Sequence, residues 1–184
     1  MRTEQELARL CTAGDREAQG ELYSLYASRL YALCYRYVAD RDEAQDLMHD
    51  AMIKAMDSFR YFSYSGDGSL YAWLRRLTVN VVIDRLRQMS KLHMVPIDST
   101  MEPGITDDDD EAVDNIPAQV LLDMVAALPS VRRTVFNMYC IDGFSHKDIA
   151  AAIGITEKGS ASILAKARNQ LKSAVNDYLK RNGR

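Results

Sequence analysis

Apolar side chains recur every three or four positions along most of the chain, and runs in which apolar and polar residues alternate are absent. This spacing places the apolar residues of a helix on one side, so the sequence predicts an all-α fold. Asp15 and Asp40 each precede such a periodic segment, and Glu43 follows three residues after Asp40. Because aspartate accepts hydrogen bonds from the first free amides of a helix, we expect helices to begin directly after both aspartates.

The segment from residue 44 to residue 59 predicts an amphipathic helix with an acidic outer side. Its apolar residues fall on one stripe, which consists of Ala44, Leu47, Met48, Ala51, Ala55, Met56 and Phe59. The other side carries Asp46, Asp50, Lys54 and Asp57. One face of this helix should therefore be buried, and the opposite face should offer carboxylates to a partner.

Glycines and small polar residues between residues 63 and 69 predict a loop, and a further helix is expected to begin near Ser69. The apolar residues of this helix are expected to point inward, and they are Leu70, Trp73, Leu74, Leu77 and Val81. The polar residues expected on its outer side are Arg75, Arg76, Asn80 and Arg87.

Aromatic residues gather around this loop. The chain has one Trp, ten Tyr and four Phe, and six of these fifteen aromatic residues lie in the segment from residue 59 to residue 73. Arg60 lies in the same segment. Unstacked nucleic-acid bases lie on aromatic rings while arginine holds the backbone, so the mixture suits a single strand. Phe59 and Trp73 continue apolar stripes and are expected in the core. Tyr61, Phe62 and Tyr64 fit either the core or a base-binding surface.

Charge divides the chain into three parts. Residues 1–90 carry 12 Lys/Arg against 13 Asp/Glu (net −1), residues 91–117 carry 1 against 8 (net −7), and residues 118–184 carry 10 against 5 (net +5). The middle part also holds three prolines and an acidic run at residues 107–111, so ordering it would bury little apolar surface. We predict two small helical domains, residues 1–90 and 118–184, joined by a flexible acidic linker, residues 91–117.

The segment from Ser145 to Leu171 has the pattern of a helix-turn-helix. Ser145 and Asp148 fit a capping box at the first helix, Gly154 permits the left-handed conformation of a sharp turn, and Thr156 is placed to cap the second helix. Basic residues follow along the second helix, where they suit phosphate contacts in a major groove: Lys158, Lys166, Arg168 and Lys172. An ordinary helical hairpin with a solvated basic face would give the same pattern.

Several other classes of protein find little support in the sequence. There is no phosphate-binding glycine loop and no HExxH motif, and the three histidines have no neighbours at metal-ligand or triad spacing, so we predict neither an enzyme nor a metal or other cofactor. The acidic run at 107–111 lacks the glycine and final glutamate of a calcium loop. His146 is expected to be solvated. The three cysteines are far apart, and each is expected to be a small buried apolar residue.

No apolar run approaches the roughly 20 residues that a membrane span requires, and the N-terminus lacks an apolar signal core. The sequence therefore predicts a cytoplasmic protein without membrane insertion.

Three segments together resemble regions 2 and 4 of extracytoplasmic-function (group IV) sigma factors of the sigma-70 family. They are residues 42–57, residues 71–80 (YAWLRRLTVN) and residues 128–171, and they occur in the family's order without the middle domain of larger sigma factors. The resemblance implies a factor that binds RNA polymerase core and directs promoter recognition and DNA melting. It also implies contacts with the β′ clamp helices and the β flap, and an anti-sigma factor as a further partner.

The resemblance also assigns roles to residues. Asp46, His49 and Asp50 match the positions that contact polymerase, although His49 stands where glutamine is usual. The minus-10 positions are Arg60, Tyr61, Phe62, Tyr64, Arg75, Arg76 and Asn80, with Asn80 beneath the loop that captures an unpaired base. The minus-35 positions are Lys158, Ser162, Lys166 and Arg168. Where the family often has large side chains exposed, this chain has Gly159, Ala161 and Ala165, so we expect sparse direct base readout.

A one-component repressor or activator is the main alternative, because it would use the same helix-turn-helix. Such a protein needs only duplex DNA, together with a ligand pocket or a dimer interface in its first domain. The acidic helix and the aromatic loop argue against it, and binding to polymerase core distinguishes the two.

Overall fold

The computed structural model describes residues 2–89 and 116–182. Every regular element within these ranges is helical, so the all-α prediction is confirmed. The chain divides into two compact units, residues 1–85 and 86–184, each with its own core. Apart from Ile116 and Pro117, the predicted linker lies outside the described residues. No helix among the described residues is long and apolar enough to cross a lipid bilayer.

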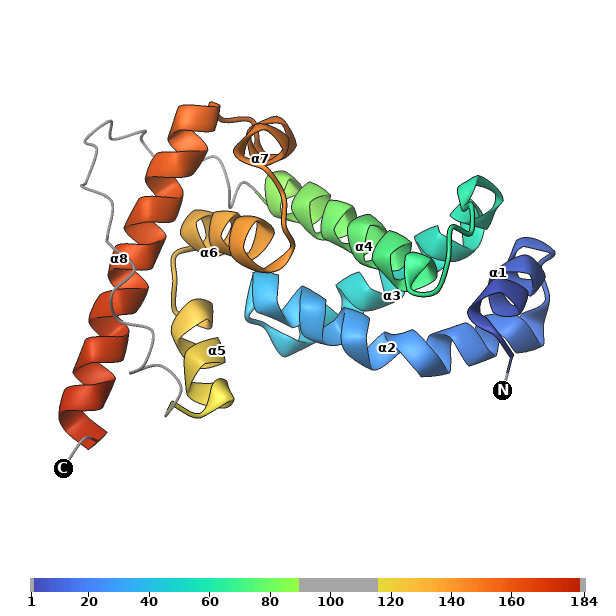
Figure 1. Cartoon of the computed structure of the whole chain (residues 1–184), viewed down its shortest axis with the longest axis horizontal. Coiled ribbons are helices and arrows are strands. Elements are labelled where there is room, and N and C mark those ends of the chain that lie inside the picture. The colour runs from blue at the N-terminus through green and yellow to red at the C-terminus, as the bar shows by residue number, and fades with distance from the viewer. Residues whose placement is uncertain (1, 90–115, 183–184) are drawn as a thin grey trace. The chain divides into compact units, whose positions relative to one another are not determined.

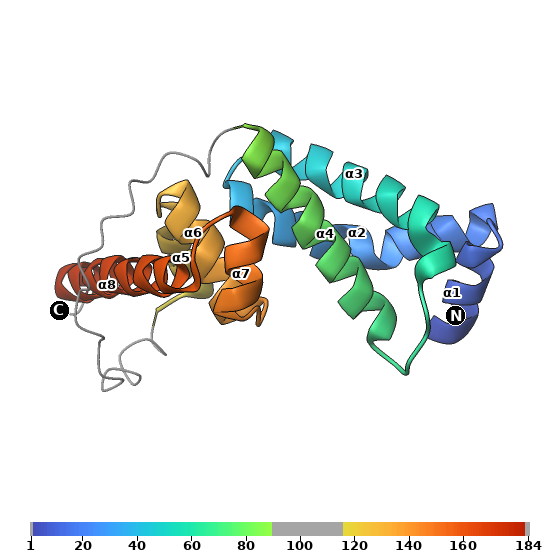
Figure 2. The same cartoon turned by 90° about the horizontal axis from the view of Figure 1, so that it is seen from above.

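Unit 1 contains four helices and one short turn: α1 (Glu4–Thr12), α2 (Arg16–Val38), α3 (Arg41–Ser58), the 3-10 turn η1 (Phe59–Tyr61) and α4 (Ser69–Gln88). Helices α2 and α3 lie side by side and antiparallel, and α1 lies beside the start of α2 (Figure 1). Helix α4 crosses α2 and α3 and begins at the end of the unit that holds α1 (Figure 2). The first turn of α4 and helix α1 are therefore neighbours.

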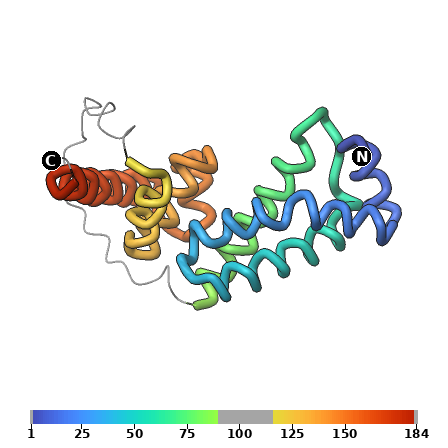
Figure 3. The backbone as a smooth tube through the Cα atoms, turned by 90° about the horizontal axis from the view of Figure 1, so that it is seen from below, coloured from blue at the N-terminus to red at the C-terminus, as the bar shows by residue number. Residues whose placement is uncertain are grey.

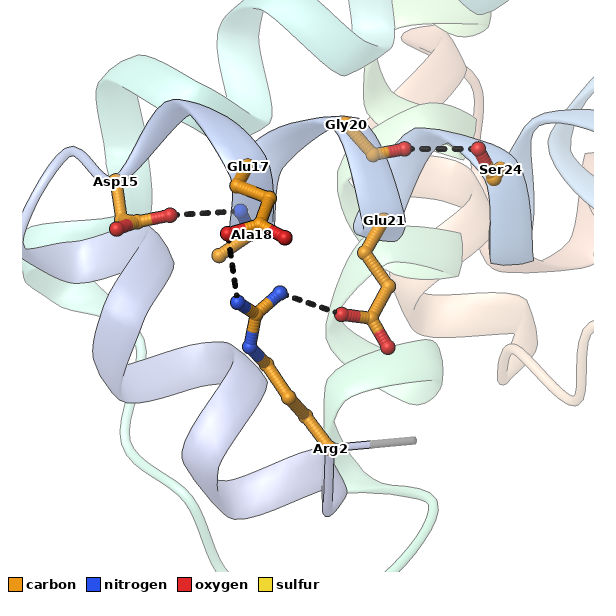
Figure 4. A network of polar contacts seen from close by, with 7 residues as sticks. All are labelled: Arg2, Asp15, Glu17, Ala18, Gly20, Glu21 and Ser24. Atoms are coloured by element: carbon orange, nitrogen blue, oxygen red, sulfur yellow. Dashed lines mark hydrogen bonds and ion pairs between the residues drawn. The ribbon is translucent and has the colours of Figure 1, made fainter.

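The predicted helix starts are confirmed. The Asp15 carboxylate accepts a hydrogen bond from the Ala18 amide at 2.8 Å, and the Asp40 carboxylate accepts one from the Glu43 amide at 2.9 Å. Arg2 joins the N-terminus to α2 through ion pairs with Glu17 at 3.1 Å and Glu21 at 2.7 Å (Figure 4). Helix α1 is thus fixed against α2 by charge as well as by its buried residues.

The apolar stripe of α3 is buried as predicted, except that Met56 is half-buried and Met52 joins the core. The prediction for α4 was only partly correct, because Trp73, Leu77 and Val81 are half-buried. The buried positions of α4 are Leu70, Leu74, Thr78, Val79, Val82, Ile83 and Leu86. Thr78 can be buried because its hydroxyl donates to the Leu74 carbonyl at 2.8 Å, so the core stripe passes through a polar residue that periodicity overlooks.

Unit 2 contains α5 (Ala118–Ala126), α6 (Ser130–Phe136), the π-helical turn η3 (Asn137–Ile141), α7 (His146–Ile153) and α8 (Glu157–Asn182). Helices α5, α6 and α7 pack on α8, the 26-residue final helix (Figure 3). Val131 and Val135 of α6 and Met138 of η3 are buried in the core of this unit. The buried Arg133 guanidinium donates to the carbonyl of Ala126, which closes the end of α5.

Candidate nucleic-acid and protein interfaces

Helix α3 presents an acidic face to solvent. Asp46 and Asp50 are exposed on this face. Ile53, one turn further on, is 62% exposed, which is unusual for a large apolar side chain. Residues at this spacing share one side of a helix, so the face combines two carboxylates with an apolar contact point. Such a mixture suits a protein partner.

His49 lies on the same side of α3 but is half-buried. Its Nε2 atom lies 3.2 Å from the Tyr23 hydroxyl of α2, and the two rings are stacked with centroids 6.2 Å apart. Tyr23 thus holds the His49 ring in place. Tyr23 could not be predicted from the sequence, because the periodicity of one helix does not show which residue of a neighbouring helix it meets. We call Asp46, His49, Asp50, Ile53 and Tyr23 the α3 face.

Three aromatic rings form a cluster where η1 meets α4. The Trp73 centroid lies 5.1 Å from that of Phe59 and 5.2 Å from that of Phe62. Phe59 is fully buried as expected, whereas Trp73 and Phe62 are half-buried. Phe62 therefore packs against two other rings while part of it stays exposed, and its base-binding role stays a prediction.

Tyr61 differs from these rings because its side chain is 73% exposed. The Arg60 guanidinium carbon lies 4.7 Å from the centroid of the Tyr61 ring. Because the cation lies over one face of this ring, the opposite face can accept a base while the cation meets a phosphate. Tyr64 is half-buried, and its hydroxyl donates to the Asp67 carboxylate at 2.7 Å. This hydrogen bond raises the pKa of Tyr64 because it stabilises the neutral phenol.

Arg76 and Asn80 are both exposed on α4, one turn apart, whereas Arg75 is half-buried. Asn80 comes seven residues after Trp73, which corresponds to roughly 10 Å along the helix. Stacked nucleotides of one strand are spaced by about 3.4 Å, so this length covers several of them. That Asn80 lies beneath the loop and helps to capture the unpaired base stays a prediction.

The helix-turn-helix in unit 2 forms as predicted. The Ser145 hydroxyl accepts from the Asp148 amide at 3.1 Å, and the Asp148 carboxylate accepts from the Ser145 amide at 3.3 Å, which completes the capping box. Gly154 adopts a left-handed φ of 73° at the turn. The Thr156 hydroxyl accepts from the Gly159 amide at 3.0 Å and caps α8.

The basic residues of α8 do not all face the same way. Lys158 is exposed, while Ser162 and Lys166 are half-buried, and their four-residue spacing aligns them on one side of the helix. Arg168 comes two residues after Lys166, which turns it about 200° away. Its guanidinium carbon lies 5.9 Å from the centroid of the Tyr139 ring, and its Nη2 lies 3.8 Å from the Cys140 sulfur. Arg168 is thus separate from the other three predicted minus-35 residues.

Gly159 was expected at an exposed position, but it is buried. A Cβ atom at this position would lie 3.1 Å from Oγ1 of Thr156, closer than nine in ten such contacts. Ala161 is exposed and Ala165 is half-buried. Gly159 therefore serves the capped start of α8, and only two small residues remain where large side chains would read bases.

His146 was predicted to be solvated, but it is half-buried and has two partners. Its ring stacks on Tyr139 with centroids 4.4 Å apart, and its Nδ1 lies 2.9 Å from the hydroxyl of the fully buried Ser160. A buried hydroxyl requires a hydrogen-bond partner, and His146 supplies it. The histidine therefore links α7 to α8 across the turn.

The cysteines also differ from expectation in one respect. Cys11 and Cys34 are buried, and the loss of solvation raises the pKa of Cys11 to about 11 and that of Cys34 to about 12. Cys140 is exposed, because it lies in the π-helical turn that also presents Tyr139. Among residues 2–89 and 116–182, no three acidic, histidine or cysteine side chains are grouped to hold a metal ion. The acidic run at 107–111 lies outside these ranges.

Comparisons with known proteins agree with this geometry. The family model described as Sigma-70 region 2 matches residues 22–91, and the one described as Sigma-70, region 4 matches residues 118–171. The ECF RNA polymerase sigma factor SigW of Bacillus subtilis is 25% identical over 174 residues, which cover 89% of this chain and 92% of that protein. SigE of Mycolicibacterium smegmatis is 26% identical over 86% of this chain, but the match spans only 60% of that longer relative.

Among solved structures, the sigma factor RpoE of Bartonella quintana, in complex with the anti-sigma factor NepR, has a similar fold. The TM-score is 0.52 and the identity 21%, over 85% of this chain and 96% of that one.

Proposed function

The chain belongs to the sigma-70 family, in its extracytoplasmic-function branch, and from this premise we propose how its two units divide the work of promoter-specific transcription initiation. Unit 1 binds polymerase core and the unpaired minus-10 strand. Unit 2 holds the minus-35 duplex. Like the family, the chain has no catalytic chemistry of its own, and it acts in the cytoplasm, where polymerase core and promoter DNA are found.

The α3 face is the proposed polymerase contact. Asp46 and Asp50 supply charge for basic residues of the β′ clamp helices, and His49 contributes a ring whose orientation Tyr23 fixes. The exposed Ile53 adds apolar area at the end of the same stripe. This combination supports a specific protein interface over nonspecific attraction, because charges alone would be screened by salt.

The proposed minus-10 site centres on Tyr61. Its exposed ring provides a stacking surface for a base that has left the duplex, and Arg60 lies beside it for the adjacent phosphate. Arg76 and Asn80 extend the contact along α4 to further nucleotides, and the Asn80 amide can both donate and accept hydrogen bonds. Phe62 and Tyr64 shape the loop from within, and Arg75 is proposed to approach the DNA backbone from beside it.

The proposed minus-35 surface is the side of α8 that carries Lys158, Ser162 and Lys166. Two lysines and one hydroxyl favour phosphate contacts and groove shape over base readout. Arg168 is proposed to support the helix-turn-helix through Tyr139. We further propose a contact of unit 2 with the β flap, and regulation by an anti-sigma factor, as in the similar structure of RpoE with NepR.

The observation that carries the proposal is that Tyr61 is exposed, whereas Phe59 is buried and Phe62 and Tyr64 are half-buried, and that Arg60 lies over the Tyr61 ring. It is tested by in-vitro transcription with polymerase core on two templates, a matched promoter and one with a pre-melted bubble. Tyr61→Ala should slow opening of the matched promoter, whereas Tyr61→Phe, which retains the ring, should behave nearly as the unaltered chain. Loss of one base–aromatic stack corresponds to roughly 1 to 3 kcal/mol.

Core binding, measured by pull-down, should be the same for both variants. Equal activity of Tyr61→Ala and the unaltered chain on both templates would remove the Tyr61 ring from the proposed minus-10 site.

A further inference from the structure

The first helix of unit 1, α1, contacts the start of its last helix, α4. The Glu4 carboxylate of α1 accepts hydrogen bonds from the Gly68 amide at 2.8 Å and from the Leu70 amide at 2.6 Å, across 64 and 66 residues of chain. Gly68 is the residue before α4 and Leu70 lies in the first turn of α4, directly after the loop that carries the proposed minus-10 site.

The start of α4 cannot provide this cap itself. The first amides of a helix have no partner within the helix, and they are usually satisfied by a side chain at the residue before it. In α4 that residue is Gly68, which has no side chain, and the first turn contains no acidic residue. Glu4 supplies both the acceptor atoms and the negative charge that the N-terminal end of a helix favours.

Helix α1 also lies against the other end of the loop. It contacts η1, the turn that ends with Tyr61. On the α2 side, the ion pairs of Arg2 fix the chain just before Glu4, and the Thr3 hydroxyl caps α1 by accepting from the Glu6 amide at 3.2 Å. Glu4 therefore lies in the first turn of a helix that is itself held at its start.

The loop needs such support. Gly66 and Gly68 both have positive φ values, 120° and 87°, and glycine loses more conformational freedom than any other residue when it is ordered. Two hydrogen bonds within the loop hold it locally. One joins Tyr64 to Asp67, and the other runs from the Ser65 amide to the Ser69 hydroxyl at 3.3 Å. Without the Glu4 contact, the hydrogen bonds at the end of the loop next to α4 would be short-range: these two and the one from the Ser69 amide to the Gly66 carbonyl at 3.1 Å.

We propose that Glu4 is a positioning residue for promoter opening: its carboxylate holds the start of α4 so that the loop is already shaped when the unpaired base arrives. The proposal rests on the proposed function of the loop. The region 2 family match begins at residue 22, so α1 and Glu4 lie before the matched part of the chain. A loop that is correctly shaped only part of the time binds more weakly in proportion to that fraction.

The experiment uses the full chain with polymerase core. Hydrogen exchange of the Gly68 and Leu70 amides reports the contact directly, and open-complex formation is followed on a matched promoter and on a bubble template. Glu4→Ala removes both acceptors, and Glu4→Gln keeps one and removes the charge. Glu6→Gln is the matched control, since it removes the same charge from an exposed position of the same helix.

We expect faster exchange at these two amides in Glu4→Ala, a smaller effect in Glu4→Gln and none in Glu6→Gln. Opening of the matched promoter should slow about tenfold in Glu4→Ala if the shaped fraction of the loop falls to about one tenth. Core binding should not change. Should Glu4→Ala lower the overall stability of the unit, Glu4→Gln provides the same comparison with a milder change.

Unchanged exchange at Gly68 and Leu70 would overturn the proposal, and so would faster exchange with normal promoter opening, because Glu4 would then be structural only. If Tyr61→Ala is silent while Glu4→Ala slows opening, the Glu4 proposal stands and the assignment of the base to Tyr61 fails. If Tyr61→Ala slows opening and Glu4→Ala does not, the reverse holds.

Discussion

Two glycines within helices give a test of the local physics, because alanine should have opposite consequences at the two positions. Gly20 lies in α2, where an added Cβ atom meets no heavy atom within 4 Å. Its carbonyl accepts the Ser24 hydroxyl at 2.9 Å, and alanine leaves this backbone acceptor unchanged (Figure 4). Gly159 lies in α8, where the added atom would meet the Thr156 cap at 3.1 Å.

The magnitudes follow from helix propensity and capping. Replacing an interior helical glycine by alanine favours the helix by about 0.8 to 1 kcal/mol, so Gly20→Ala should stabilise unit 1 by that amount. Gly159→Ala gains no more than this, but it displaces the Thr156 hydroxyl from its bond, which costs about 1 kcal/mol. The net effect of Gly159→Ala should therefore be near zero or destabilising.

Urea unfolding of the full chain measures both effects. Trp73 is the chain's single tryptophan and lies in unit 1, so its fluorescence follows unit 1, while far-ultraviolet circular dichroism follows the helices of both units. Gly20→Ala should move the fluorescence transition to higher urea, equivalent to a rise of roughly 4 to 8 °C in Tm for a unit of this size. Gly159→Ala should leave that transition unchanged.

A double-mutant cycle isolates the Thr156 contact. In a Thr156→Ala background the obstructing hydroxyl is absent, so Gly159→Ala should then stabilise unit 2 by close to the full propensity gain. If Gly159→Ala stabilises the unaltered chain as much as it stabilises the Thr156→Ala variant, the Thr156 hydroxyl is not the reason for glycine at position 159, and the prediction is refuted.

Three further predictions concern the proposed interfaces and the exposed thiol. Reversing Asp46 and Asp50 together to lysine should weaken binding to polymerase core by about tenfold or more while helicity is retained, and an unchanged pull-down would exclude the α3 face from the interface. Lys166→Ala should reduce the slope of log affinity against log salt concentration for minus-35 DNA by about one unit. Arg168→Ala should leave this slope unchanged and lower the thermal stability of unit 2. A smaller slope in Arg168→Ala would place Arg168 back on the DNA surface. A thiol reagent at pH 8 should modify Cys140 rapidly and the two buried cysteines only after unfolding, because burial raises the pKa values of both, and equal labelling of all three in the folded chain would contradict this.

Features that depend on neighbours in sequence were predictable. The caps at Asp15, Asp40 and Ser145 and the left-handed Gly154 all formed as expected, because a cap involves residues only two or three positions apart. The buried stripe of α3 was predictable for the same reason. The stripe of α4 was not, because a buried threonine that satisfies its own hydroxyl looks polar in the sequence.

Features that depend on contacts between distant segments were not predictable. No periodicity places Glu4 at the start of α4, Tyr23 against His49, or Ser160 beneath His146. In each case a polar group on one helix satisfies a group on another, so the information lies in how the helices pack. The only sequence signal for the Glu4 contact was indirect: a helix that begins after glycine, with no acid in its first turn, needs an acceptor from elsewhere.

The two proposed DNA surfaces are unequal in what they can read, and this inequality has a consequence for promoter choice. On α8, the side that carries Lys158 offers one hydroxyl and two small alanines for contacts with base edges, so the discrimination of 1 to 3 kcal/mol typical of a good bidentate contact is absent there. The loop around Tyr61 reads bases only after the duplex has opened. We therefore infer that unit 2 sets the position and salt dependence of binding, and that unit 1 sets sequence preference at the opening step. The Glu4 contact belongs to that step, since a loop held in shape lets the energy of base stacking go into opening the promoter instead of into ordering the loop.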